Sequence, residues 1–178
     1  MVTITSLNED LRLKLEPRTV TYKSRMKTVK HLADAGVPVG IMTAPIIPGL
    51  TSHEIPGLIK TAAENGASVA GYTIVRLNGS IAEVFKDWLY KNFPDRADKV
   101  WHQISDCHGG QVNDSRWGTR TRGEGKIAES IRSLFKMSVK KYMKGGDKFE
   151  YDTEGFSKNR QEIFRKQQSK GQISLFDE

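Results

Sequence analysis

Residues 36–53, GVPVGIMTAPIIPGLTSH, form an apolar run bounded by glycine and proline, with a helical pattern before it and another after it. Such a run is typical of a buried parallel strand. The strand ends at Pro48-Gly49, and Thr51 or Ser52 is placed to cap the next helix. Because ligands bind at the carboxyl ends of strands in α/β sheets and barrels, we expect residues 43–50 to line a site. The alternative, which this stretch alone favours, is a structural strand with an ordinary Pro-Gly turn.

Alternating and helical periodicities extend this unit in both directions. Residues 8–17 are interpreted as a connecting segment, and residues 111–125, rich in glycine and arginine, as a loop. The repeated order of strand and helix predicts an α/β fold with a right-handed parallel sheet. The further elements predicted are strands over residues 2–7 and 69–75 and helices over residues 21–35, 52–65, 81–92, 96–105 and 126–144.

The predicted sheet is too small to be complete. Three parallel strands that begin at residue 2 cannot close a barrel, and they leave a hydrophobic edge. We expect either an N-terminal portion of a barrel or another chain to cover that edge, and we give the first the larger weight. On either account the sheet is completed by strands from outside these residues.

The chain of 178 residues carries a net charge of +7, and the excess is concentrated toward its end. Residues 111–178 hold 15 lysines and arginines against 10 acidic residues. This favours a polyanionic partner, nucleic acid first, with a solvated basic surface as the alternative. The single Cys107 excludes an internal disulfide and a multi-cysteine metal site within the chain. With no apolar run long enough for a bilayer and no signal-peptide pattern, we expect a cytoplasmic protein with no membrane partner.

Two groups of motifs resemble a known enzyme superfamily. Residues 16–18 (EPR), 32–36 (LADAG) and 45–50 (PIIPGL) resemble the second half of a radical S-adenosylmethionine (SAM) enzyme. More narrowly, residues 108–110 (HGG), 113–116 (NDSR) and 120–125 (RTRGEG) resemble the group labelled DNA repair photolyase, which is related to spore photoproduct lyase. The resemblance covers roughly residues 2–140 and implies a partial (β/α)6 TIM-like barrel. The three strands predicted here would be its fourth, fifth and sixth.

This resemblance also implies a division of the chain. Residues 1–93 would be the second half of the barrel, residues 94–146 a helical and Arg/Gly-rich extension, and residues 147–178 a flexible tail. In the superfamily a 4Fe–4S cluster is held by three cysteines that follow the first strand, a motif that this chain lacks. The cluster ligands would therefore lie in the missing N-terminal half of the barrel. We do not expect these residues alone to cleave SAM.

The resemblance implies a SAM pocket at the carboxyl ends of the strands, formed by hydroxyl, charged and apolar residues. It places Thr5 and Ser6 at the ribose or amino-acid part of SAM, Ala44, Pro45 and Ile46 along the adenine, Arg76 at a carboxylate or phosphate, and Glu16 and Arg18 in a contributing loop. For each residue the alternative is a capping hydroxyl, a core position or a surface ion pair.

The Arg/Gly-rich loop is a candidate nucleic-acid contact. Guanidinium groups interleaved with an aromatic side chain suit phosphate contacts and base stacking. The alternative is that these arginines pair with Asp114, Glu124 and Glu129. The candidates are Arg116, Trp117, Arg120, Arg122 and Lys126.

The end of the chain carries one more short motif. Gln172, Leu175 and Phe176, within the sequence QISLF, resemble the peptide by which bacterial proteins dock on the DNA sliding clamp. A glutamine that forms hydrogen bonds and a Leu-Phe pair that fills a pocket suit such docking. The alternative is a tail that folds back onto its own domain.

Taken together, these patterns predict the C-terminal part of a radical SAM enzyme whose substrate is related to nucleic acid or DNA repair. The alternative is a non-enzymatic basic module that contacts DNA, the sliding clamp, or both. No catalytic residue is assigned. His102, Asp106, Cys107 and His108 lie close together in the sequence, but their spacing fits no zinc pattern, so no metal site is predicted within the chain.

Overall fold

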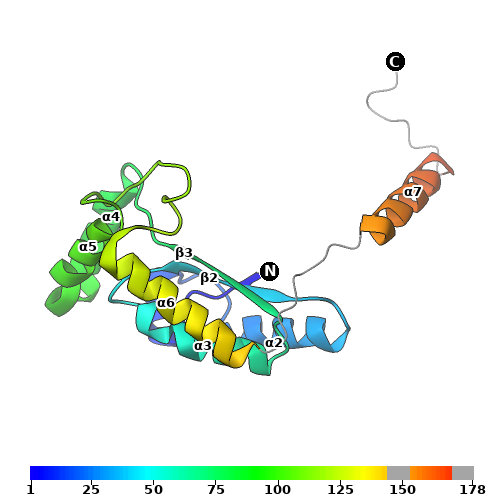
Figure 1. Cartoon of the computed structure of the whole chain (residues 1–178), viewed down its shortest axis with the longest axis horizontal. Helices are drawn as coiled ribbons and strands as arrows, with labels where there is room; N and C mark the ends of the chain where they lie inside the picture. Colours follow the sequence, from blue (N-terminus) through cyan, green and yellow to red (C-terminus); the bar gives the residue numbers. More distant parts are fainter. Residues whose placement is uncertain (144–152, 170–178) are drawn as a thin grey trace, which may run out of the picture. The chain divides into compact units, whose positions relative to one another are not determined.

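The computed structural model describes residues 1–143 and 153–169 of the chain (Figure 1). The chain divides into two compact units, Met1–Gly146 and Asp147–Glu178. The extension predicted over residues 94–146 therefore belongs to the same unit as the strands. The second unit contains helix α7 (Thr153–Ser169), an element that was not predicted within the tail.

The first unit combines three strands with helices that follow the predicted order. Its strands β1 (Val2–Thr3), β2 (Gly40–Ile46) and β3 (Val69–Ile74) alternate with helices α1 (Glu9–Leu15), α2 (Tyr22–Asp34), α3 (Ile55–Glu64), α4 (Ile81–Asn92), α5 (Ala97–Asp106) and α6 (Gly125–Tyr142), and two single-turn 3₁₀ helices, η1 (Ser52–Glu54) and η2 (Pro94–Arg96), complete the described elements. The α/β class is confirmed.

The strands form one open parallel sheet in the order β1-β2-β3. Strand β1 is short, but the amide of Ile4 donates to the carbonyl of Met42 at 2.9 Å and continues the pairing. In the register between β2 and β3, Met42 pairs with Gly71 and Thr43 pairs with Tyr72. The sheet does not close into a barrel within the described part of the chain.

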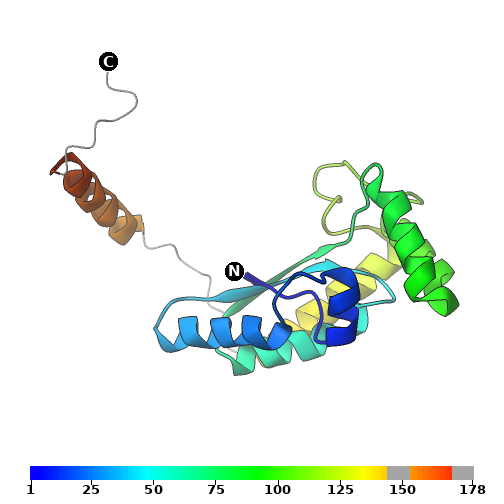
Figure 2. The same cartoon turned by 180° about the vertical axis from the view of Figure 1, so that it is seen from behind.

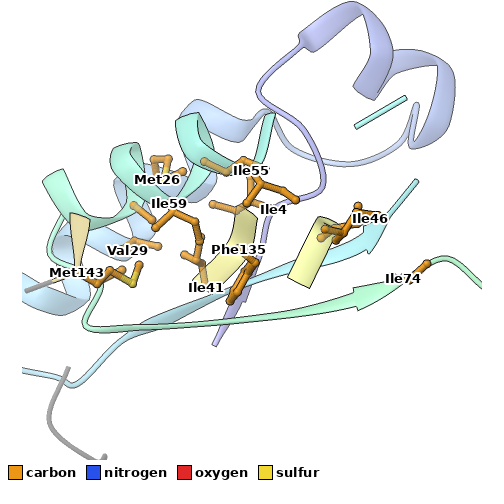
Figure 3. Packing of buried hydrophobic residues seen from close by; sticks show 14 of the residues in the cluster. Ile4, Met26, Val29, Ile41, Ile46, Ile55, Ile59, Ile74, Phe135 and Met143 are labelled. Atoms are coloured by element: carbon orange, nitrogen blue, oxygen red, sulfur yellow. The ribbon is translucent and has the colours of Figure 1, made fainter. Parts of the chain in front are cut away.

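One face of the sheet carries the main hydrophobic core, which is shown in Figure 3. Ile4 and Ile41, both fully buried, meet Val29 of α2 and Ile59 of α3 on this face. Helix α6 adds Phe135, whose ring centroid lies 4.6 Å from that of Tyr72. Helices α2 and α3 run side by side in both views of the chain (Figures 1 and 2).

The opposite face of the sheet carries small and polar residues together with the apolar side chains of Met42 and Val69. Alternation along the strands places Thr3, Gly40, Met42 and Gly71 on it. A Cβ atom built on Gly71 would lie 2.9 Å from Met42 Cε, which confirms that these two residues share a face. None of these four residues belongs to either hydrophobic core of the described residues. Parallel sheets are ordinarily covered on both faces, and within residues 1–143 the helices of this one pack on a single face.

A second hydrophobic core lies beyond the carboxyl ends of the strands. It joins Leu11 of α1, Leu50 of the Pro-Gly turn, Leu77 after β3, Leu89 of α4 and Ile104 of α5. Helix α4 is also bonded to α1, because the indole N–H of Trp88 donates to the Lys14 carbonyl at 3.0 Å. The turns that carry the predicted site residues are thus held between two packed cores.

Two local predictions are wrong. Residues 9–15 form helix α1 rather than a connecting segment, because the Asn8 side chain accepts from the Leu11 amide at 3.0 Å and caps it. Thr51 and Ser52 do not cap the next helix. Their hydroxyl groups accept from the amides of Ile47, at 2.9 Å, and Gly49, at 3.2 Å, and so stabilise the Pro-Gly turn.

Candidate functional site

A polar cluster joins the end of β1 to the loop after α1. The Thr5 hydroxyl donates to Glu16 Oε1 at 2.7 Å. Glu16 Oε2 accepts from Arg25 Nη2 of helix α2 at 2.9 Å. Thr5 is buried and Glu16 half-buried, so these bonds form away from bulk water. The fold therefore brings together two residues that the SAM resemblance selected, and adds Arg25.

The environment of Glu16 keeps its carboxyl group ionised. Partial burial raises its pKa, but hydrogen bonds from Thr5 and Arg25 lower it by more, and the net pKa lies below the ordinary value. The carboxylate is thus a fixed negative charge beside the open face of the sheet. Such a group accepts hydrogen bonds from hydroxyl groups such as those of a ribose.

The apolar candidates on β2 have different environments. The Ala44 carbonyl lies 3.4 Å from the Thr5 hydroxyl, which places Ala44 next to the polar cluster. Pro45 is exposed and follows a cis peptide bond. Ile46 is 3% exposed and belongs to the main core. Of the three, only Ala44 contacts the polar cluster, and Pro45 is exposed next to it in the chain.

Ser6 is turned away from this cluster. Its hydroxyl donates to Glu54 Oε1 at 2.8 Å and accepts from the Asn8 amide at 2.9 Å. Glu54 also accepts from the Leu7 amide at 2.6 Å. Ser6 is 4% exposed, and these bonds hold the turn between β1 and α1 against η1. Ser6 therefore acts as a capping hydroxyl, the alternative to a role in SAM binding.

The two remaining arginines of the predicted SAM site are not part of the cluster. Arg76 follows β3, and its Nη1 donates to the Asp114 carbonyl at 3.1 Å. Arg18 is exposed, and its side chain forms no hydrogen bond or ion pair with residues 1–143 or 153–169. The structure therefore assembles Thr5, Glu16 and Ala44, and leaves Arg18 and Arg76 outside.

Arg116 in the Arg/Gly-rich loop is paired with carboxylates, as the alternative interpretation of that loop predicts. Its Nε donates to Asp114 Oδ1 and its Nη2 donates to Asp114 Oδ2, each at 3.0 Å. Nη2 also donates to Glu124 Oε1 at 2.5 Å. Asp114 is 5% exposed and also accepts from the Thr119 hydroxyl at 2.9 Å. The Arg116 guanidinium holds the pKa of Asp114 far below its ordinary value, and the two carboxylates raise the pKa of Arg116. This clamp fixes the loop.

The other loop candidates remain accessible. Trp117 is 87% exposed, and the Arg120 guanidinium lies 5.0 Å from the centroid of its ring. Arg122 and Lys126 are exposed. Arg122 is also part of the wall of a cavity, whereas Lys126 is not.

That cavity, of about 620 Å³, lies along the free edge of β3 and was not predicted. Strand β3 contributes Gly71 and Tyr72, and helix α6 contributes Arg132, Phe135 and Lys136. The segment 118–123 forms the opposite wall. We refer to this cavity as the basic pocket. The signal present in the sequence was the spacing of four between Arg132 and Lys136, which puts both on one side of a helix.

No group of three or more metal-ligating side chains occurs among the residues that the structure describes. Cys107 is fully buried, and burial, followed by the nearby Asp106 carboxylate, raises the pKa of its thiol to about 11. It is a core residue and not a reactive thiol. The sliding-clamp motif, Gln172, Leu175 and Phe176, lies outside the described residues.

Within residues 1–143 and 153–169, every helix is too short or too polar to cross a bilayer. Comparison of the chain with protein-family models, with curated proteins and with solved structures found no match.

Proposed function

We propose that this chain is the SAM-binding half of a radical SAM β/α barrel. The observation that carries the proposal is the one-sided parallel sheet, with Thr5, Glu16 and Ala44 gathered at its carboxyl end. In a β/α barrel one face of the sheet packs on helices and the other faces the interior. The open face, with Gly40 and Gly71, is the surface that further strands of a barrel would enclose.

The polar cluster supports the binding of SAM rather than of an anion. SAM carries ribose hydroxyl groups, an ammonium group and a sulfonium, all of which an ionised carboxylate stabilises. Glu16 provides that carboxylate, and Arg25 and Thr5 orient it. Ala44 and Pro45 provide apolar surface beside it for an adenine ring.

The chain's own residues do not fit an iron–sulfur cluster. Its only cysteine, Cys107, is fully buried in the main core. In the proposal the cysteines that would hold the cluster lie in the other half of the barrel, and the cluster would supply the reducing electron for the cleavage of SAM. The part played by this chain is to bind and orient SAM and to exclude water from it.

The DNA upstream of the Met1 codon, read in frame, tests the arrangement in halves. The proposal expects further strand–helix units there and three closely spaced cysteines after the first strand. A stop codon followed by a ribosome-binding site directly before Met1 would overturn the assignment to a half barrel within one protein.

A second candidate function, a basic binding module without SAM chemistry, is favoured by the accessible Trp117 and by the basic pocket. It predicts salt-sensitive binding of DNA by the chain alone. Binding should weaken when Arg120 and Arg122 are replaced by glutamine. It should be unchanged when Lys99 and Lys140, two exposed lysines outside the loop, are replaced by glutamine instead.

A further inference from the structure

The basic pocket has a defined structural origin. The amide of Ile74 in β3 donates to the Thr121 carbonyl at 2.8 Å, which holds the segment 118–123 against the strand. Gly118 and Gly123 in that segment have φ values of +89° and +67°, a backbone conformation that favours glycine. A Cβ atom on Gly123 would lie 3.0 Å from the Cys107 carbonyl. The segment is therefore fixed in place, and the cavity lies between it and helix α6.

Three cationic side chains line the basic pocket: Arg122 from the loop, and Arg132 and Lys136 from α6. No aspartate or glutamate is among the lining residues. In the described part of the chain, none of the three cationic groups forms a side-chain hydrogen bond or an ion pair. Like charges around one cavity repel one another, and a bound anion would relieve that repulsion.

The contrast with Arg116 shows that this lack of partners is local. Arg116 lies in the same loop and is held by Asp114 and Glu124. Glu124 is only two residues from Arg122, yet its carboxylate is directed to Arg116. The loop therefore neutralises one arginine and leaves another available at the cavity.

The remaining walls suit an aromatic ring. Tyr72 lines the cavity and packs against Phe135, which also lines it, with 4.6 Å between their ring centroids. The volume of about 620 Å³ falls in the range typical of small-molecule sites, about 300–1,000 Å³. A guanidinium group can bind two oxygens of one phosphate at the same time, and a tyrosine ring can stack on a base.

We propose that the basic pocket binds a phosphate-bearing ligand, a nucleotide. Arg122, Arg132 and Lys136 hold its phosphate, and Tyr72 contacts its base. This inference goes beyond the proposed SAM site, which lies at Thr5 and Glu16 and shares no lining residue with the pocket. A free nucleotide and a nucleotide unit of a single strand present the same chemistry, and the test separates them.

The test is titration calorimetry of the full chain with three probes at fixed low salt: ADP, the oligonucleotide dT10 and inorganic phosphate. The informative variant carries Arg122→Gln and Lys136→Gln, both at exposed positions outside the core. Its matched control carries Lys99→Gln and Lys140→Gln, which removes two charges from exposed positions of α5 and α6 that do not line the pocket. We expect the first variant to bind about tenfold more weakly or worse, because charge-assisted contacts are lost, and the control to bind as wild type does.

Each outcome decides the proposal. Saturable binding of ADP, lost in the pocket variant only, supports a free nucleotide, and binding of dT10 alone with the same loss supports a strand. An equal loss in the control variant would show that binding follows net charge and would overturn the pocket. No saturable binding of ADP or dT10, or phosphate binding as tight as that of ADP, would also overturn it. Glu16→Gln should leave ADP binding unchanged, so this proposal and the SAM proposal fail independently.

Discussion

The Thr5 hydroxyl donates to the Glu16 carboxylate at 2.7 Å, joining the end of β1 to the loop that follows α1. Neither residue lies in a hydrophobic core of the described residues, although both have leucine or isoleucine neighbours in the sequence. Their position is set instead by Arg25, which binds Glu16 and also donates to the Thr3 carbonyl at 2.8 Å. A polar network thus joins the end of β1 to α2 and to the loop after α1.

Replacing Glu16 by glutamine should destabilise the protein. The substitution removes the charge that Arg25 binds and leaves that guanidinium half-buried without its partner. We expect a loss of about 1–3 kcal/mol in the free energy of unfolding, measured by urea denaturation at pH 7. Glu64→Gln, on the exposed surface of α3, is the control and should change stability little. Equal stability of Glu16→Gln and wild type would contradict the described network.

The stability of the wild type should also depend on Glu16 as the pH falls. Because the pKa of Glu16 is depressed in the folded state, its contribution is present above the unfolded value of about 4.3 and is lost as the pH falls through the folded value. The difference in melting temperature between wild type and Glu16→Gln should therefore shrink below about pH 4. A difference that stays constant from pH 7 to pH 3 would exclude this linkage.

Asp114 should control the order of the Arg/Gly-rich loop. Asp114→Asn removes the charge that binds Arg116 and weakens the bond from Thr119, so the loop should open more often. We expect faster cleavage by trypsin after Arg116, Arg120 or Arg122, followed by mass spectrometry. Asp87→Asn, in an exposed pair with Lys91 on α4, is the control. If both variants are cleaved at the wild-type rate, the clamp does not hold the loop.

Cys107 should be inert in the folded protein. It is fully buried, and burial raises the pKa of its thiol to about 11, so at pH 8 it is neutral and inaccessible. Iodoacetamide should modify it only in denaturant, as read by the mass of the intact protein. Rapid alkylation of the native protein would mean that the turn after α5 is open in solution.

The apolar elements of this fold could be predicted from the sequence, and the polar ones could not. Strand β2 and helix α2 were predicted because apolar residues mark their buried faces and glycine marks their ends. Helix α1 was missed because its seven residues are mostly polar and its stability depends on the Asn8 cap and on Leu11. Helix α7 was missed because no clear apolar stripe marks it.

The candidate sites show the same division. Thr5, Glu16 and Ala44 were selected through a resemblance, and the fold brings the Thr5 hydroxyl within hydrogen-bonding reach of the other two. Ser6, selected with them, is bonded to Glu54, 48 residues away, a contact that no local pattern predicts. The basic pocket was missed because its cationic residues lie on a loop and a helix and become neighbours only when α6 packs beside β3.

Binding of SAM itself is best measured by equilibrium dialysis of radiolabelled SAM against the purified chain, with Glu16→Gln and Glu64→Gln as matched variants. We expect saturable binding of about one SAM per chain, weakened about tenfold by Glu16→Gln through the loss of a charged contact and unchanged by Glu64→Gln. Absence of saturable binding by the folded chain, or binding that Glu16→Gln leaves unchanged, would contradict the assignment of this sheet and its polar cluster to SAM.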